Sequence, residues 1–271
     1  MNKFNMYCLC LDNQLLKKVK NLNYIPVGLG ENKFDIEWLR DNTGNNISFK
    51  NKYYGEYSFH FWLWKNFLKD IKEDEWVGFC TYRRFWSNEK NLDESNIEFE
   101  DKILKKIPKI WNNYDVILAN KIYVDGIKWS KVIKHGKLAL IKNPKSIFKN
   151  NRNIKFQFDM FHGVGIIDKA IKVLEKEERN DFKEYICNNN SFNQANMFIC
   201  KSNKILIKYY ETIFKWLENC EKIFGFNLHG YGKIRIYAFL AERFLPFWFN
   251  KYANCLEWPI IFNDLRNEIK D

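Results

Sequence analysis

The chain has 271 residues, of which 46% are hydrophobic and 18% aromatic, and its formal net charge is +11. This composition excludes an intrinsically disordered chain, and the length is sufficient for a substantial core. No internal repeat or linker-like stretch interrupts the sequence, so we predict one domain over residues 1–271. The basic residues are mostly lysines spread along the chain, which favours steering of anionic substrates and does not predict a nucleic-acid partner.

The seven cysteines are scattered and form no Cys-x-x-Cys pair, which argues against a zinc site and predicts free thiols in a reducing, cytoplasmic compartment. The N-terminal residues lack the apolar core of a signal peptide. No apolar run approaches the roughly twenty residues that a membrane span needs. The aromatic stretch 244–249 leaves two interpretations: a buried core helix, which we favour, or peripheral association with the inner face of the cytoplasmic membrane.

The first half of the chain alternates between strand and helix patterns. We predict a strand, a helix and a second strand that together form a βαβ unit of a parallel sheet, at residues 5–11, 14–20 and 24–28. A polar loop, an aromatic helix and a buried strand are predicted next, at residues 41–51, 53–68 and 76–80. A polar surface excursion is expected over residues 90–101.

The second half is richer in helix patterns. The predicted helices are 102–111, 163–178, 202–224 with Ser202 as N-cap, and 234–251. Strands are predicted at 114–119 and 192–200, and a long basic loop at 121–148. One more apolar strand or turn is expected after residue 256. The order of elements predicts an α/β protein with a mixed, mainly parallel sheet flanked by helices and a helical C-terminal part.

Two adjacent arginines directly follow the predicted strand 76–80, in the sequence Tyr82-Arg83-Arg84. Ligands of open α/β sheets bind at the carboxyl ends of the strands, and the forked donors of arginine suit phosphate oxygens. We therefore hypothesise that Arg83 and Arg84 bind the diphosphate of a nucleotide-activated substrate. The alternative is a structural salt bridge at the surface.

No Asp-x-Asp motif, the usual ligand pair for Mn²⁺ or Mg²⁺ in nucleotide-sugar enzymes, occurs in the chain. The sequence therefore indicates no metal site and no firm cofactor, and a requirement for Mn²⁺ or Mg²⁺ is the alternative. Without a metal ion, Arg83 and Arg84 would stabilise the leaving diphosphate directly.

Candidate general bases lie in two places. Asp159 and His162 are three residues apart and share one face if the segment is helical, so they fit a base and its orienting partner. A helix-terminal cap is the alternative role for this pair. Glu242, on the last helix, is the second candidate, and Glu56 is a candidate ligand of a sugar hydroxyl. The charges of Arg235 and Arg243 on the same apolar helix predict ion pairing or a position facing a site.

Six segments occur in an order that resembles one known family. They are IPVGLG (25–30), LRDNTGNNIS (39–48), NKYYGEYSFHFWLWKN (51–66), WVGFCTYRRFW (76–86), NMFI (196–199) and FLAERFLPFW (239–248). Together they resemble the bacterial glycosyltransferase family of capsular polysaccharide and lipopolysaccharide gene clusters, long filed as a domain of unknown function. The resemblance spans nearly the whole chain, with two departures: Thr81 stands where the family usually has histidine, and Gly55 stands where many relatives have cysteine before the glutamate that is Glu56 here.

The resemblance implies a GT-A-like fold and transfer of a sugar from a nucleotide-diphosphate donor to a capsular or lipopolysaccharide glycan. Galactofuranose or its N-acetylamino form is the donor class that some relatives suggest. On this basis the donor pocket is expected to be shaped by Asp41, Thr43, Gly44, Asn46 and Ser48, with Tyr82, Arg83 and Arg84 on the diphosphate. The opposite side is expected to hold Asn196, Arg235, Glu242 and Arg243.

Two other functions remain as alternatives. The first is a non-catalytic protein that binds an anionic ligand such as RNA or a glycan, for which binding would depend steeply on salt. The second is an inactive partner in a polysaccharide assembly complex. The position of Arg83 and Arg84 after a strand, and not along a helix face, favours the transferase.

Overall fold

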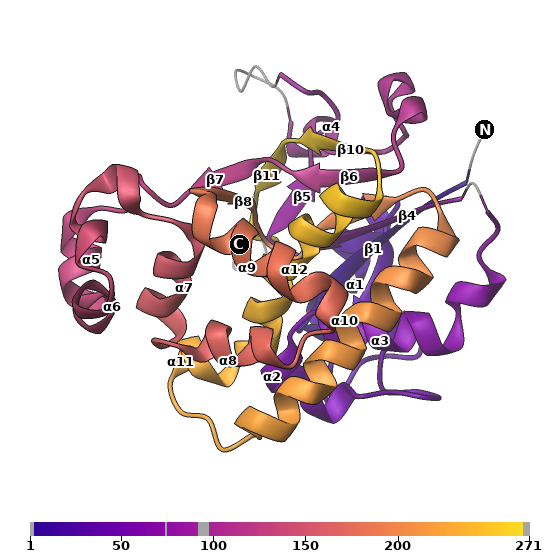
Figure 1. The fold of residues 1–271 in the computed structure, drawn as a ribbon. Coiled ribbons are helices and arrows are strands. Elements are labelled where there is room, and N and C mark those ends of the chain that lie inside the picture. Colours follow the sequence, from indigo (N-terminus) through magenta and orange to yellow (C-terminus); the bar gives the residue numbers. More distant parts are fainter. Residues whose placement is uncertain (1–2, 74, 92–97, 268–271) are drawn as a thin grey trace.

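The computed structural model describes residues 3–73, 75–91 and 98–267. Its centre is a twisted sheet with helices packed around it (Figure 1). Within the described residues this sheet has nine strands, and seven of them follow the order β10-β6-β9-β4-β1-β2-β3. Their bounds are β1 (Phe4–Cys10), β2 (Ile25–Gly28), β3 (Leu39–Arg40), β4 (Trp76–Thr81), β6 (Val116–Ala119), β9 (Phe198–Cys200) and β10 (Cys255–Trp258).

The sheet is mixed but mainly parallel. Strand β9 pairs antiparallel with both β4 and β6, whereas the other neighbours along this path pair in parallel. β5 (Arg84–Trp86) folds back antiparallel on the end of β4 and pairs with β11 (Ile260–Phe262). A separate two-stranded ribbon joins β7 (Lys121–Tyr123) to β8 (Ser191–Asn193).

The α-helices of the described residues are α1 (Leu16–Asn21), α2 (Asn51–Tyr54), α3 (Tyr57–Asn66), α4 (Phe99–Lys102), α5 (Trp129–His135), α6 (Lys137–Lys142), α7 (Ile154–His162), α8 (Ile166–Lys172), α9 (Lys176–Asn188), α10 (Asn203–Phe224), α11 (Tyr231–Ile234) and α12 (Ile236–Tyr252). The longer ones lie mainly in the second half of the chain. Among the described helices, none is long and apolar enough to cross a membrane.

Alternation along the strands divides the interior into two cores, because successive side chains of a strand point to opposite faces. Val77 and Phe79 of β4 lie in the core that includes the aromatic faces of α3, α10 and α12. Trp76 and Cys80 lie in the other core, which also contains residues of α1 and the tryptophans Trp86, Trp111 and Trp258. The aromatic stretch 244–249 belongs to the first core, so the core-helix interpretation is confirmed: Phe244 and Phe249 are fully buried.

Most strands and long helices fall where the sequence predicts them, including the βαβ unit, β4, β6, α10 and α12. The N-cap is also confirmed, since the Ser202 hydroxyl accepts a hydrogen bond from the Ile205 amide at 3.4 Å. Three predicted elements are divided. Gly55, with φ of 56°, separates α2 from α3. The expected helix 163–178 contains all of α8 and the start of α9, and a turn divides strand 192–200 into β8 and β9.

Two predictions were wrong. Residues 102–111 form no α-helix beyond Lys102 and contain only the start of a 3-10 helix at Lys109–Asn113, which directly follows Pro108. The residue before a proline is kept out of the α region, so a helix through this segment is disfavoured. The expected loop 121–148 instead holds β7, α5 and α6. Of the expected surface excursion 90–101, residues 92–97 lie outside the described residues.

Candidate active site

Two adjoining cavities open at the carboxyl edge of the parallel strands. The first, of about 220 Å³, is lined by Leu9, Leu11, Leu29, Asn51, Lys52, Gly55, Glu56, Thr81, Tyr82, Arg83, Arg84 and Arg235. The second, of about 150 Å³, is lined by Glu56, Arg83, Arg84, Gln194, Ala195, Asn196, Tyr231, Arg235, Ala238, Phe239 and Glu242. The four charged side chains common to both cavities are Glu56, Arg83, Arg84 and Arg235. We call the two cavities together the cleft.

The strand topology explains why the cleft forms here. The parallel strands β1, β2 and β4 end at this edge, and the segments after them supply Leu11, Leu29 and Arg83. Because β9 runs in the opposite direction, its start lies at the same edge and brings Asn196 to the second cavity. Ligands of open α/β sheets bind at this edge, so the position is the one expected for a substrate site.

The turn between β4 and β5 carries Arg83 into the cleft. Thr81 pairs with Arg84 across this turn, and the Arg83 amide donates to the Thr81 hydroxyl at 3.4 Å. The segment after β11 binds the backbone of the turn from its other side. The Asn263 amide donates to the Arg83 carbonyl and the Leu265 amide to the Tyr82 carbonyl, each at 3.1 Å. The backbone of this arginine turn is thus fixed on both sides.

The two guanidinium groups are available to a ligand. Among the described residues, neither Arg83 nor Arg84 donates a side-chain hydrogen bond or forms an ion pair, so the predicted alternative of a structural salt bridge finds no partner there. The Arg83 Nε is buried and has no partner among the described residues, and the Arg83 guanidinium carbon lies 5.2 Å from the Tyr82 ring centre. Unpaired cationic donors at the mouth of a cavity create a site for an anion.

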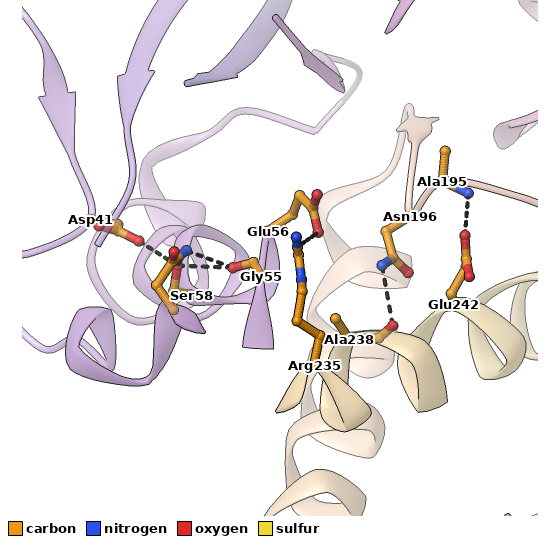
Figure 2. Close-up of polar contacts among 10 residues, drawn as sticks. Asp41, Gly55, Glu56, Ser58, Ala195, Asn196, Arg235, Ala238 and Glu242 are labelled. Atoms are coloured by element: carbon orange, nitrogen blue, oxygen red, sulfur yellow. Dashed lines mark hydrogen bonds and ion pairs between the residues drawn. The ribbon is translucent and has the colours of Figure 1, made fainter. Parts of the chain in front are cut away.

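Glu56 and Arg235 join the two halves of the chain across the cleft (Figure 2). Arg235 Nη2 lies 3.3 Å from Glu56 Oε2, and both side chains are about one quarter exposed, at 26% and 23%. The glycine before Glu56 permits this approach, since a Cβ on Gly55 would lie 2.3 Å from Arg235 Nη2. Its φ of 56° also favours glycine.

Asp41 supports the wall of the cleft from behind. It is fully buried and accepts hydrogen bonds from the Gly30 amide at 2.8 Å and the Ser58 hydroxyl at 2.5 Å. Asn51, which lines the cleft, donates to the same hydroxyl and to the Gly55 carbonyl. Burial raises the pKa of Asp41 to about 6 against the lowering effect of its hydrogen bonds. Its position is behind the lining residues and not at the surface of the cleft (Figure 2).

The rest of the predicted donor loop is satisfied by its own contacts. The Thr43 hydroxyl donates to the Arg40 carbonyl and accepts from Trp62 Nε1 at 3.0 Å. The side-chain oxygen Oδ1 of Asn46 accepts from both the backbone amide and the hydroxyl of Ser48. Gly44, with φ of 55°, lies against Asn66. None of these four residues lines either cavity. The structure therefore places them in the packing of the loop on α3.

On the other side, Glu242 lies in the second cavity and accepts a hydrogen bond from the Ala195 amide at 2.7 Å (Figure 2). Its other oxygen pairs with Arg243, which is buried, donates to Gln157 Oε1 at 2.9 Å and has its pKa lowered by burial. Arg243 thus lies behind Glu242 and outside the cavity lining, where it fixes the orientation of that carboxylate.

Asn196 contributes an amide side chain to the same cavity. Its Nδ2 donates to the Ala238 carbonyl at 3.2 Å, while its Oδ1 is buried without a partner among the described residues. Ala195 and Asn196 both have left-handed backbone conformations, with φ of 79° and 50°. Strain of this kind in residues other than glycine concentrates at functional sites.

Asp159 and His162 do share α7 but neither lines the cleft. Asp159 pairs with Lys155 at 2.8 Å and accepts from the Gly165 amide at 3.0 Å. His162 Nδ1 lies 3.0 Å from the Gly232 carbonyl, and its ring stacks 4.0 Å from that of Phe239. Burial, with a smaller contribution from Arg243, lowers the pKa of His162 to about 3. Both residues hold the end of α7 to its neighbours.

Sequence reasoning missed several lining residues, among them Asn51, Gln194 and Tyr231. Asn51 is the last residue of the predicted polar loop, but its role depends on the break between α2 and α3 at Gly55. Gln194 lies in a segment that the sequence predicts as continuous strand. Among residues 3–73, 75–91 and 98–267, no group of three or more His, Cys, Asp and Glu side chains is arranged to hold a metal ion.

Comparison with known proteins gives the family and the fold of the chain. The model of the family described as Domain of unknown function (DUF4422) matches residues 7–254, so the chain belongs to this family. Among solved structures, the chain is similar to the apo structure of WbbM, a bifunctional glycosyltransferase, with a TM-score of 0.71 at 22% identity. The likeness covers 96% of this chain and 45% of that one, so this chain spans less than half of WbbM. No curated protein matches.

At this level of identity the likeness establishes the fold. The chain has a GT-A-like α/β fold, with a mixed, mainly parallel sheet flanked by helices, as the sequence predicted.

Proposed function

We propose that this protein is a glycosyltransferase that moves a sugar from a nucleoside-diphosphate donor to a hydroxyl group of a glycan. The observation that carries the proposal is the position of Arg83 and Arg84 at the carboxyl end of β4, in a cleft that also contains Glu56 and Glu242. Within the part of the chain that the structure describes, neither arginine side chain has an ion-pair partner. The GT-A-like fold supports the same class of reaction.

The two cavities suit the two substrates. The first is bordered by the strand ends and the arginine turn, and we assign to it the donor, with its diphosphate on Arg83 and Arg84. The second contains Glu242 and Asn196, and we assign to it the acceptor. Because Glu56, Arg83, Arg84 and Arg235 border both cavities, the reacting carbon would lie where they meet.

In the proposed reaction Glu242 is the general base. The acceptor oxygen bonds to the anomeric carbon while the bond from that carbon to the diphosphate oxygen breaks. The hydroxyl proton passes to the Glu242 carboxylate, and the electron pair leaves with the diphosphate. Arg83 and Arg84 stabilise the negative charge that develops on the diphosphate. This stabilisation is the catalytic contribution of preorganised cationic donors. This course inverts the anomeric centre.

The finer assignments follow the resemblance of the sequence. We propose a capsular or lipopolysaccharide glycan as acceptor and a furanose, such as galactofuranose or its N-acetylamino form, as the transferred sugar. The same resemblance supports action in the cytoplasm. Asp41 serves in this proposal as a positioning residue for the donor wall, through its hydrogen bonds to Gly30 and Ser58.

The direct test combines ligand-induced stabilisation with turnover. Thermal unfolding is measured with a panel of nucleoside diphosphates and nucleotide sugars, with and without Mn²⁺, and release of nucleoside diphosphate is followed with each donor. A ligand at 100 times its dissociation constant adds about 2.7 kcal/mol to stability. Selective stabilisation by one nucleotide, with transfer from its sugar, supports the proposal.

No shift with any nucleotide would contradict the proposed function. Steeply salt-dependent binding of RNA or of an anionic glycan would then favour the binding-protein alternative. Nucleotide binding without turnover of any donor would favour an inactive partner of an assembly complex.

A further inference from the structure

The helices α5 and α6 form a hairpin that projects from one side of the molecule, away from the central sheet (Figure 1). Large apolar side chains of this segment face solvent. They are Trp129, Ile133, Leu138, Ile141, Ile147 and Phe148, and we call them the hairpin surface. Leu138 and Ile141 are 70% and 74% exposed. Several large apolar side chains exposed on one segment are typical of an interaction site.

The same segment is strongly basic. Residues 128–149 contain seven lysines and no Asp or Glu. These lysines are Lys128, Lys131, Lys134, Lys137, Lys142, Lys145 and Lys149, and all of them are exposed. None forms an ion pair with another described residue. The hairpin surface is therefore surrounded by uncompensated positive charge.

The exposure is a property of a fixed structure. A small core of Val132, Ala139, Phe156 and Met160 packs α5 and α6 against α7. Buried Arg152 fastens the base of the hairpin, because its Nε donates to the Ser146 carbonyl at 3.1 Å and its Nη1 to the Ile127 carbonyl at 2.8 Å. Its guanidinium also lies 4.5 Å from the Trp129 ring centre. The apolar side chains thus point outward from a hairpin that is anchored.

We propose that the hairpin surface docks the protein on an anionic lipid bilayer. Aromatic and aliphatic side chains surrounded by lysines are the composition of segments that lie in a membrane interface, where the apolar groups enter the acyl boundary and the lysines meet anionic headgroups. A second copy of this chain would place two sets of lysines against each other, which disfavours self-association. Binding of RNA would leave Leu138 and Ile141 exposed.

The position of the hairpin relates the bilayer to the cleft. The hairpin packs on α7, whose last residue His162 stacks on Phe239 of the second cavity. Under the proposed function, docking would hold the acceptor side of the cleft near the headgroups, where a lipid-linked glycan is found. This orientation rests on the proposed function, whereas the docking itself does not, so the test below uses no nucleotide or glycan.

The test is co-sedimentation of the full chain with vesicles. One set contains phosphatidylglycerol mixed with phosphatidylcholine, and the other contains phosphatidylcholine alone. We expect binding to the anionic vesicles, weakening as salt rises, and little binding to the neutral ones. Two variants probe the two contributions: Leu138→Ser with Ile141→Ser removes apolar area, and Lys134→Glu with Lys137→Glu reverses charge. Each should weaken vesicle binding by about tenfold or more.

A matched control changes the same residue types elsewhere: Lys33→Glu with Ile36→Ser lies in the loop between β2 and β3, where both side chains are exposed. This variant should bind vesicles as the unaltered chain does. Thermal unfolding of each variant checks that it is folded. The proposal is overturned if the unaltered chain ignores anionic vesicles, if the folded hairpin variants bind as it does, or if the control loses binding equally.

Discussion

Arg235, which precedes α12, reaches the Glu56 carboxylate, which precedes α3, at a distance of 3.3 Å. This ion pair lies at the junction of the two cavities, which Arg83 and Arg84 also line. A bound diphosphate would therefore compete with Glu56 for Arg235. Arg235 is thus a cation that a ligand could bind only by displacing the Glu56 carboxylate.

Replacing Glu56 by Gln should tighten binding of the nucleoside diphosphate. The substitution removes a negative charge and frees Arg235, and a partly exposed ion pair has a coupling of about 0.2–1 kcal/mol, so the dissociation constant should fall by up to about fivefold. Titration calorimetry measures this. Glu257→Gln, which breaks the Lys121–Glu257 pair outside the cleft, serves as the control and should leave the constant unchanged. Weaker binding by Glu56→Gln would contradict the competition.

Alanine at Arg83 or at Arg84 should strongly reduce turnover while the protein stays folded. Loss of one preorganised donor to the transition state lowers kcat by about 10²- to 10³-fold, as removal of an oxyanion donor does. The melting temperature should change little, because neither side chain has a hydrogen-bond partner among the described residues.

Arg179→Ala is the opposite control for these variants. Arg179 donates two hydrogen bonds to the Leu174 carbonyl and does not line the cleft. This variant should lose stability and keep its kcat. If both Arg83→Ala and Arg84→Ala remain fully active, the diphosphate assignment is wrong.

Glu242→Gln should lower kcat by about 10²- to 10⁴-fold, the usual contribution of a general base. It also leaves the buried Arg243 without its carboxylate, so we expect a loss of stability of about 3 kcal/mol. Kinetics must therefore be measured well below the melting temperature. Glu242→Asp keeps the counter-charge and should recover the stability without recovering the rate.

Asp159→Asn separates the two base candidates. It removes the charge that pairs with Lys155, so the variant should be less stable, yet kcat should stay within a few-fold of the original. If kcat falls strongly for Asp159→Asn while Glu242→Gln stays active, the general base is Asp159 on α7 and not Glu242.

Asp41 should make stability depend on pH in an unusual direction for a carboxylate. Burial raises its folded pKa from 3.8 to about 6, so its contribution is most favourable when both states are protonated and is lost as pH rises through 6. Between pH 4 and pH 8 this group should lower the unfolding free energy by about 2 kcal/mol. Urea unfolding of the original chain and of Asp41→Asn at both pH values isolates the effect: the variant should lose that part of the slope. Equal slopes would mean that Asp41 has an ordinary pKa.

The position of the arginine turn could be predicted because it follows from burial alone. A short apolar strand that ends in charged residues has to bring them to a sheet edge, and Arg83 and Arg84 lie there. Residues 41–48 show the limit of this reasoning. Thr43 and Asn46 have the composition of a ligand-binding loop, but the same side chains also satisfy their own turns, and the sequence does not distinguish the two uses.

Other features have no local signal. The left-handed turn at Ala195 contains no glycine, so the strand prediction ran through it. In α5 and α6 the lysines alternate with apolar residues on a surface that faces solvent, which obscured the helical period that a buried face produces. The charge of Glu242, in contrast, predicts its exceptional position, because a charged side chain on an apolar helix requires a partner or faces a site, and Glu242 lies in the second cavity.

The arginine turn depends on amides from Asn263 and Leu265, which are synthesised long after the turn itself. A growing chain can complete the central strands on the ribosome, yet the arginine turn lacks these two contacts until residues 263–265 have emerged. Under the proposed function, chains that stop before these residues would therefore bind and transfer activated sugars poorly. The order of synthesis itself would then keep such shortened products inactive in the cell.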